Sequence, residues 1–166
     1  MPINYEEKKL KKSIFVPREN IYQVEEGDLL SPKFDQKGLI PCIITDYSSK
    51  EVLMHAYMNT ESLEKTIKSG QGHYWSRSRK KLWKKGSSSG MIHKVKEILI
   101  DDDQDTVWLK VEVQGLGASC HVGYKSCFYR AVRKGNKSST KLKFLEKEKV
   151  FDPKIVYAGE TNPTQV

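Results

Sequence analysis

The sequence predicts an α+β protein whose main element is a bent, mainly antiparallel β-sheet with one or two helices. Two observations carry this prediction. Short β-prone runs recur along residues 34–133, whereas a single stretch has the apolar spacing of a helix. A chain of 166 residues is also close to the size of one domain. We therefore expect an N-terminal extension over 1–33, one domain over 34–133 and a basic C-terminal extension over 134–166.

The first part of this domain is expected to be a β-hairpin. Residues 39–44 and 52–54 are two apolar, β-prone runs. The polar residues 46–50 between them have the composition of a turn.

The clearest helix is predicted over residues 61–69. Leu63 and Ile67 are four residues apart, which places both on one helix face. Either Asn59 or Thr60 can cap its start, because both side chains accept hydrogen bonds from free backbone N–H groups.

The remaining strands follow this helix. We expect strands over 73–78, 93–100 and 127–132, with a Lys-, Gly- and Ser-rich loop over 80–90. Residues 107–113 give the cleanest alternation in the chain, which is typical of a half-buried strand. Its inward residues are Val107, Leu109, Val111 and Val113, and its outward residues are Trp108, Lys110 and Glu112.

Charge and hydropathy narrow the possible partners. The net charge of +8 favours anionic partners such as nucleotides and phosphosugars, although many of the cations near both ends fit an ordinary solvated surface. No stretch approaches the roughly 20 apolar residues that cross a bilayer, and the charged start is unlike a signal peptide. We expect a cytoplasmic protein with no membrane partner.

Four carboxylates, Asp101, Asp102, Asp103 and Asp105, directly follow an apolar strand. Carboxylates this close repel one another unless a cation neutralises them, although an acidic turn is the simpler interpretation. In an extended chain, Asp101, Asp103 and Asp105 would face one side and Asp102 the other. Three carboxylates on one side suit Mg²⁺.

The chain has three cysteines, an odd number that argues against a disulfide framework. Cys120 and Cys127 lie near His121 among small residues, and sulfur and imidazole ligands favour Zn²⁺. A catalytic zinc site needs three protein ligands, which Asp102, Cys120 and Cys127 would supply. Buried free cysteines are also common, so the spacing alone leaves both interpretations open. Cys42 lies in an apolar run and is expected in the core.

Several motifs occur in the order found in one enzyme family. They are Lys33-Phe34-Asp35, Gly38-Leu39-Ile40-Pro41, Val52-Leu53-Met54, Ala56-Tyr57-Met58-Asn59, His73-Tyr74-Trp75-Ser76-Arg77-Ser78-Arg79, Leu82-Trp83, Lys85-Gly86, Ser89-Gly90, the acidic cluster, and 118–130 (ASCHVGYKSCFYR). On these residues the chain resembles the phosphoribosyl-AMP cyclohydrolases of histidine biosynthesis.

The resemblance implies a homodimer with a zinc site shared between subunits and a Mg²⁺ site on Asp101, Asp103 and Asp105. It also implies the reaction, in which water adds at purine C6 and the N1–C6 bond of phosphoribosyl-AMP opens. Asp102 stands where this family has a cysteine, and Ser87 stands where it usually has an acidic residue. Because thiolate and carboxylate carry the same charge, we expect a working site with altered metal preference.

Roles for individual side chains follow from their chemistry. His121 is the candidate for proton transfer, since imidazole titrates near neutral pH, and His73 is a weaker one. The candidate substrate-binding residues combine cations, hydroxyls and an aromatic ring that either stacks on a base or packs in the core. They are Trp75, Ser76, Arg77, Arg79, Lys85, Ser88, Ser89 and Gly90.

The sequence also allows a binding function in place of hydrolysis. A homologue altered by the Asp102 exchange would act as a nucleotide-binding or nucleic-acid-binding module, and the basic ends would then matter. We favour the hydrolase, with a small-molecule substrate and no nucleic acid partner.

Overall fold

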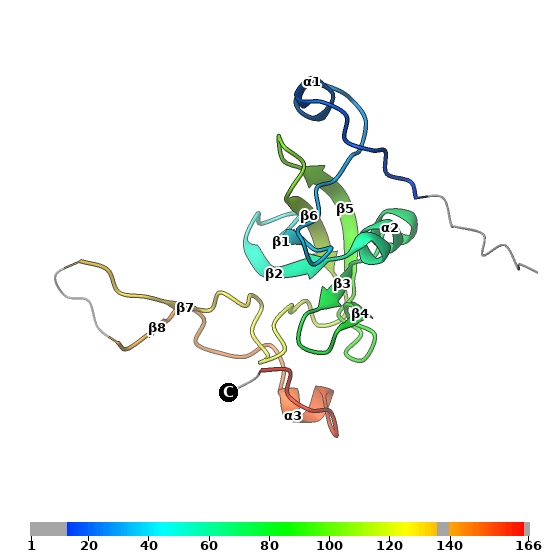
Figure 1. Cartoon of the computed structure of the whole chain (residues 1–166). Helices are drawn as coiled ribbons and strands as arrows, with labels where there is room; N and C mark the ends of the chain where they lie inside the picture. The colour runs from blue at the N-terminus through cyan, green and yellow to red at the C-terminus, as the bar shows by residue number, and fades with distance from the viewer. Residues whose placement is uncertain (1–12, 136–139, 165–166) are drawn as a thin grey trace, which may run out of the picture.

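The computed structural model describes residues 13–135 and 140–164, and a curled six-stranded sheet is its centre (Figure 1). The strand order is β4 (Lys81–Lys84), β3 (His73–Ser76), β2 (Val52–Met58), β1 (Ile40–Asp46), β6 (Val107–Val113) and β5 (His93–Ile100). Four of the neighbouring pairs are antiparallel, but β1 and β6 run parallel. The α+β class is confirmed, and the sheet is mixed rather than purely antiparallel.

The apolar alternation of β6 forms the middle of the core, as predicted. Val107, Leu109 and Val111 are buried, whereas Trp108 on the opposite face is exposed. Neighbouring β1 adds the fully buried Ile44 to the same cluster. The hairpin of β1 and β2 is also confirmed, with a turn over residues 46–50.

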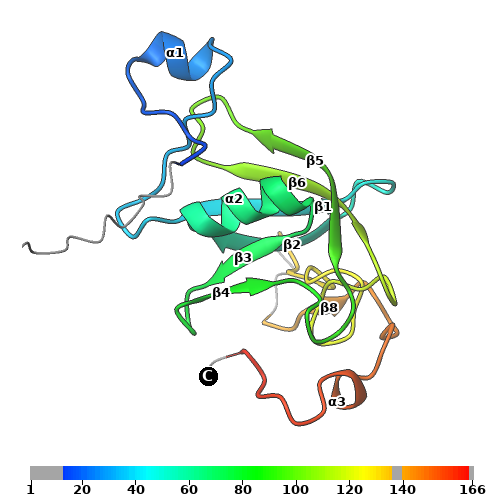
Figure 2. The ribbon, with the colours of Figure 1, turned by 90° about the vertical axis from the view of Figure 1, so that its right-hand side faces the viewer.

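Helix α2 (Thr60–Ser69) packs on one face of the sheet against β2, β3 and β4 (Figure 2). The Asn59 side chain accepts a hydrogen bond from the Ser62 backbone, which makes Asn59 the cap. Leu63 is buried and Ile67 packs against the core. The predicted helix is confirmed and starts one residue earlier than expected.

Strand β4 lies inside the stretch that was expected to be a loop, and β3 ends at Ser76 rather than at residue 78. The sequence signal was weak because Leu82 and Trp83 are the only apolar residues among lysines. Hydrogen-bonded pairing with β3 makes this segment a strand. The Trp83 ring lies 5.2 Å from the Tyr74 ring and packs against the core.

The predicted core strand over 127–132 is wrong. The Cys127 N–H donates to the Leu53 carbonyl, and the chain then turns away from the main sheet. Only β7 (Arg130–Ala131) remains, and it pairs with β8 (Lys143–Phe144) in a separate two-stranded arm that projects from the sheet (Figure 1). Val132 is 78% exposed, so an apolar residue type does not indicate burial in this segment.

Two further helices are very short: α1 (Ile21–Glu25) and α3 (Pro153–Val156). The described residues therefore contain three helices, whereas one or two were expected. The two short ones were missed because a helix of four or five residues is too short to show a periodic apolar pattern. Both extensions touch the domain. The buried Gln104 side chain donates to the Val24 carbonyl, and Phe151 packs against a small cluster around Met91. No helix within 13–135 and 140–164 is long and apolar enough to span a bilayer.

Candidate active site

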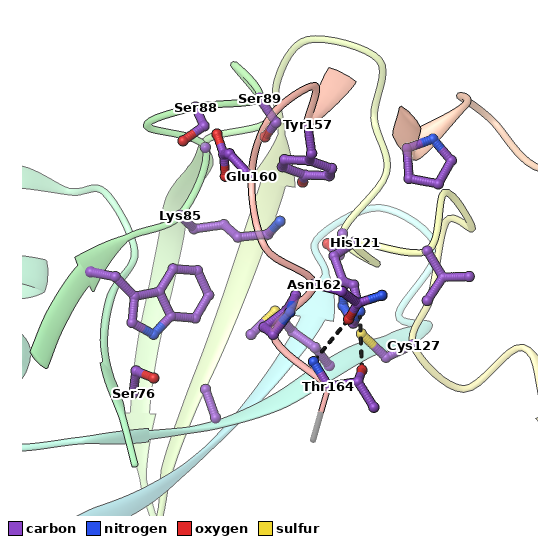
Figure 3. A pocket seen from close by; sticks show the side chains of 18 of the residues that line it. Ser76, Lys85, Ser88, Ser89, His121, Cys127, Tyr157, Glu160, Asn162 and Thr164 are labelled. Atoms are coloured by element: carbon purple, nitrogen blue, oxygen red, sulfur yellow. Dashed lines mark hydrogen bonds between the residues drawn. The ribbon is translucent and has the colours of Figure 1, made fainter. Parts of the chain in front are cut away.

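A cleft of about 930 Å³ opens beside β2, β3 and β4. One wall is the loop that follows β4, from Lys85 to Ser89, and another contains Ser119, His121 and Cys127. The C-terminal segment from Pro153 to Thr164 lies over the opening (Figure 3). Segments distant in sequence therefore meet in one cleft.

Cys127 lines one end of this cleft, and its thiol is hydrogen-bonded to that of the buried Cys120, which is not itself among the lining residues. A tight turn brings Cys120 into place, since the Gly123 N–H donates to the Cys120 carbonyl. Gly123 has φ +107, and a Cβ there would lie 2.4 Å from the Phe151 carbonyl oxygen, so only glycine fits.

The pKa values of the two thiols are shifted in opposite directions. The hydrogen bond from Cys127, together with backbone N–H groups and the nearby Lys85 ammonium, lowers the pKa of Cys120 to about 6. The same hydrogen bond, with burial, raises the pKa of Cys127. The pair therefore holds a thiolate at neutral pH, which is the form that binds transition metals.

Lys85 and His121 lie beside these thiols. Lys85 is only 5% exposed, and burial lowers its pKa while the two cysteines raise it. Burial and the Lys85 charge lower the pKa of His121, whereas a hydrogen bond that the ring donates to the Asn162 side chain raises it. The Thr164 hydroxyl lies 3.4 Å from His121 Nε2 (Figure 3). The net shift keeps His121 neutral and able to accept a proton at pH 7.

Cations and hydroxyls line the rest of the cleft. The structure brings all but one of the candidate substrate-binding residues to it: Trp75, Ser76, Arg77, Arg79, Lys85, Ser88 and Ser89. Gly90 is outside the lining, because its N–H closes a turn onto the Gly86 carbonyl. The Arg77 guanidinium stacks on the Tyr57 ring at 4.1 Å, which holds that charge at the cleft wall. His73 is not among the lining residues.

The acidic cluster forms a second group. Oxygens of Asp101, Asp103 and Asp105 lie within 4.8 Å of one another. An extended chain was expected here, but the chain turns at Gln104, which has φ +58. The Asp101 carboxylate accepts from the N–H groups of Asp105 and Thr106 at 2.9 Å each. Burial and the neighbouring Asp103 and Asp101 charges raise the pKa of Asp105, so a cation would be stabilised here.

Asp102 belongs to this acidic loop and not to the cysteine cleft. The acidic loop precedes β6, and the segment that contains the cysteines follows it. Both views place these two segments at opposite ends of the sheet (Figure 1, Figure 2). Seven strand residues separate them, which corresponds to about 20 Å. Among residues 13–135 and 140–164, the aspartate group is the only set of three metal-type ligands brought together.

Several lining residues had no sequence signal as candidates. His55 and Tyr57 reach the cleft because the folded sheet places residues 54–57 of β2 along it. Tyr157, Glu160, Asn162 and Thr164 come from a segment whose composition resembles a polar tail (Figure 3). Tertiary packing alone assigns them to the site.

Comparison with known proteins accounts for this combination of residues. Residues 54–129 match the model of the phosphoribosyl-AMP cyclohydrolase family. A phosphoribosyl-AMP cyclohydrolase from Rhodopseudomonas palustris strain BisA53 is 54% identical over 134 residues, which cover 81% of this chain and 90% of the relative. The same-named protein of Nitrobacter winogradskyi is 50% identical over 138 residues, covering 83% and 94%. This chain belongs to the phosphoribosyl-AMP cyclohydrolase family.

The resemblance inferred from the motifs is thereby confirmed. The residues matched to the cyclohydrolase model include most of β2, all of β3 to β6, and both Cys120 and Cys127. The C-terminal segment that covers the cleft lies outside the matched residues.

Proposed function

We propose that this protein hydrolyses 1-(5-phosphoribosyl)-AMP by opening the N1–C6 bond of the purine ring. The product is the formimino aminoimidazole carboxamide ribonucleotide of histidine biosynthesis. Family membership supports the reaction. The observation that carries it is a single cleft that joins a thiol pair, a neutral histidine and a wall of cations.

The substrate's two phosphate groups require separate cationic contacts. Arg77 and Arg79 supply two guanidinium groups from the turn after β3, and Ser88 and Ser89 add hydroxyls from the loop that follows β4. Guanidinium groups bind phosphate oxygens bidentately. Trp75 lines the same wall, where its ring is available to stack on the base.

Proton transfer is assigned to His121. It lies at the cysteine end of the cleft, and burial holds its pKa below the ordinary value, so it accepts a proton from the attacking water. The buried Lys85 ammonium faces both thiols and stabilises their charged form. Its position allows Lys85 to interact with the reacting part of the substrate as well as with the substrate phosphates.

The cofactors are proposed to be Zn²⁺ and Mg²⁺. Cys120 and Cys127 would hold the zinc with Asp102, and their shared thiolate suits that metal. When bound, the zinc acidifies water at neutral pH. Asp101, Asp103 and Asp105 would hold Mg²⁺, because their oxygens already lie within 4.8 Å of one another.

The homodimer is part of the proposal, and the position of Asp102 supports it. Since Asp102 and the cysteines of one chain lie beyond opposite ends of β6, a zinc site that uses all three takes Asp102 from a second copy. The β7–β8 arm offers apolar surface for such a partner. Its exposed side chains are Phe128 at 57%, Val132 at 78%, Phe144 at 53% and Leu145 at 58%. Cytoplasmic location stays a prediction.

The test is a direct assay. Purified protein is mixed with phosphoribosyl-AMP, Mg²⁺ and Zn²⁺, and ring opening is followed by ultraviolet absorbance. We expect turnover that a chelator abolishes and that Cys127→Ala removes. Metal analysis of the purified protein is expected to find a transition metal, and its absence would exclude the zinc assignment.

Asp102→Cys distinguishes the remaining outcomes. An inactive natural protein that gains activity with Asp102→Cys would mean that the site keeps its shape but serves nucleotide or nucleic acid binding. Salt-sensitive RNA or DNA binding that disappears when both ends are trimmed would support that alternative.

A further inference from the structure

A chain of three buried polar groups runs behind the cysteine end of the cleft. The Tyr74 hydroxyl lies 2.8 Å from His93 Nδ1, and His93 Nε2 lies 2.9 Å from the Ser119 hydroxyl. Tyr74 and His93 are completely buried, and Ser119 is 3% exposed. They come from β3, β5 and the loop after β6, so the chain crosses the interior and ends at a residue that lines the cleft.

His93 is neutral in this position. Burial, with the nearby Lys85 charge, lowers its pKa to about 3. A neutral imidazole has one N–H donor and one acceptor nitrogen, so only two arrangements of this chain exist. Either Nε2–H donates to Ser119 while Nδ1 accepts from Tyr74, or both hydrogen bonds run in the opposite direction.

The tyrosine decides between these arrangements. Within the described residues, the Tyr74 hydroxyl has no hydrogen-bond partner other than His93. If His93 donated to it, the Tyr74 O–H would be buried without an acceptor, which is costly. Tyr74 therefore donates to Nδ1, and Nε2–H donates to the Ser119 oxygen.

This direction leaves the Ser119 proton without an acceptor inside the protein. Its oxygen accepts from His93, and no second partner of this hydroxyl occurs among residues 13–135 and 140–164. Ser119 lines the cleft next to Cys120 and on the same wall as His121. An O–H that lines a ligand cleft and has no internal acceptor is satisfied by the ligand or by water.

We propose that Ser119 is a catalytic hydrogen-bond donor to the substrate oxygen formed at C6, and that Tyr74 and His93 are positioning residues that fix its direction. The proposal rests on the proposed function. Water adds across the C6–N6 double bond, so oxygen bonds to C6 and N6 gains a proton. The remaining proton of that oxygen then passes to N1 as the N1–C6 bond breaks and the carboxamide forms.

Negative charge develops on the C6 oxygen during this collapse. A donor that is already oriented stabilises that charge without reorganisation, and loss of one such donor lowers kcat by roughly 100-fold. The effect falls on kcat rather than on KM, because the oxygen is absent from the bound purine.

The hydrogen-bond direction is tested without activity. Long-range ¹⁵N–¹H correlation spectra of the full chain report the tautomer of each of its four histidines, and His93→Gln assigns the His93 signals. We expect the Nε2–H tautomer at pH 7, with a mixture of tautomers in Tyr74→Phe. An Nδ1–H tautomer in the natural protein overturns the proposal.

The catalytic part is tested by kinetics with zinc content measured in parallel. Ser119→Ala is expected to lower kcat by roughly 100-fold with KM within about 2-fold, while Ser119→Thr, which keeps the hydroxyl, retains most of the activity. Ser31→Ala is the matched control, since Ser31 is also buried but its hydroxyl has no hydrogen-bond partner in the part of the chain that the structure describes.

The outcomes separate the two proposals. An inactive natural protein contradicts the proposed function. An active natural protein whose kcat is unchanged in Ser119→Ala, or falls only in proportion to lost zinc, contradicts the assignment of Ser119.

Discussion

The two candidate sites, at opposite ends of the sheet, differ in how much of each site a single chain builds. At the cysteine end, Cys120, Lys85 and Ser119 are almost entirely buried, and the thiols already share a hydrogen bond. At the other end, Asp101 is exposed and the carboxylates gather only through a backbone turn. Burial makes the first end sensitive to the charge state of every group, whereas water screens the second.

This difference is compatible with the proposed role of Asp102 in the zinc site of a second copy. Asp101, Asp103 and Asp105 are used by their own cluster, but Asp102 between them is not part of that set. A residue on an exposed loop is accessible to a second copy, whereas of the two thiols Cys120 is buried and Cys127 is exposed. The comparison therefore predicts unequal effects of mutations at the two ends.

The largest effect is expected at the thiol pair. Cys127→Ala removes a proposed zinc ligand and leaves Cys120 without its hydrogen-bond partner. We expect kcat to fall by more than about 100-fold and zinc to be lost on dialysis. Cys42→Ala is the control, since Cys42 is buried in the core away from the cleft. Equal activity losses in both variants would contradict a special role for the thiol pair.

Mixing variants of the two ends tests the shared site. Cys127→Ala and Asp102→Ala proteins are each expected to be inactive alone. After mixing and exchange of subunits, half of the dimers carry one variant of each kind, and one of their two sites is intact. Activity should return to about a quarter of the natural value. Continued inactivity, with heterodimers detected by mass spectrometry, would mean that both ends do not contribute to one site.

Acid is expected to destabilise the buried end through His93. Its pKa is about 3 when folded and 6.5 ordinarily, so between these values the unfolded chain binds a proton that the folded chain does not. Stability is therefore lost as the pH falls through this window. Between about pH 6 and 4.5 this histidine alone should remove about 2 kcal/mol. Urea unfolding of His93→Gln should show a correspondingly weaker pH dependence; an identical one would contradict the neutral, buried histidine.

The smallest effect is expected at the acidic loop. Asp103→Asn removes one of three clustered charges but breaks none of the hydrogen bonds that Asp101 makes to the turn. We expect the Mg²⁺ concentration for half-maximal activity to rise roughly 10-fold, with zinc content unchanged. Glu112→Gln, a surface change outside the cluster, is the control. A loss of zinc in Asp103→Asn would mean that the two ends are not separate.

Much of the fold could be predicted because local patterns survive in the tertiary structure. The alternation over β6 and the spacing in α2 each report one buried face, and both elements were found where expected. The motifs likewise identified the family, because ordered residues such as those around Cys120 carry that information in sequence alone. The segment around Val132 failed because its apolar residues are exposed on an arm.

The arrangement of the site was decided only by the tertiary structure. The parallel pairing of β1 with β6 joins strands that are distant in sequence, and the C-terminal segment reaches His121 through packing that leaves no local pattern. The direction of the chain from Tyr74 through His93 to Ser119 depends on contacts between residues 19 and 26 positions apart. Sequence determined which chemical groups this protein carries, because side-chain identity is local. Folding decided which groups meet, because burial and hydrogen bonding act between distant segments.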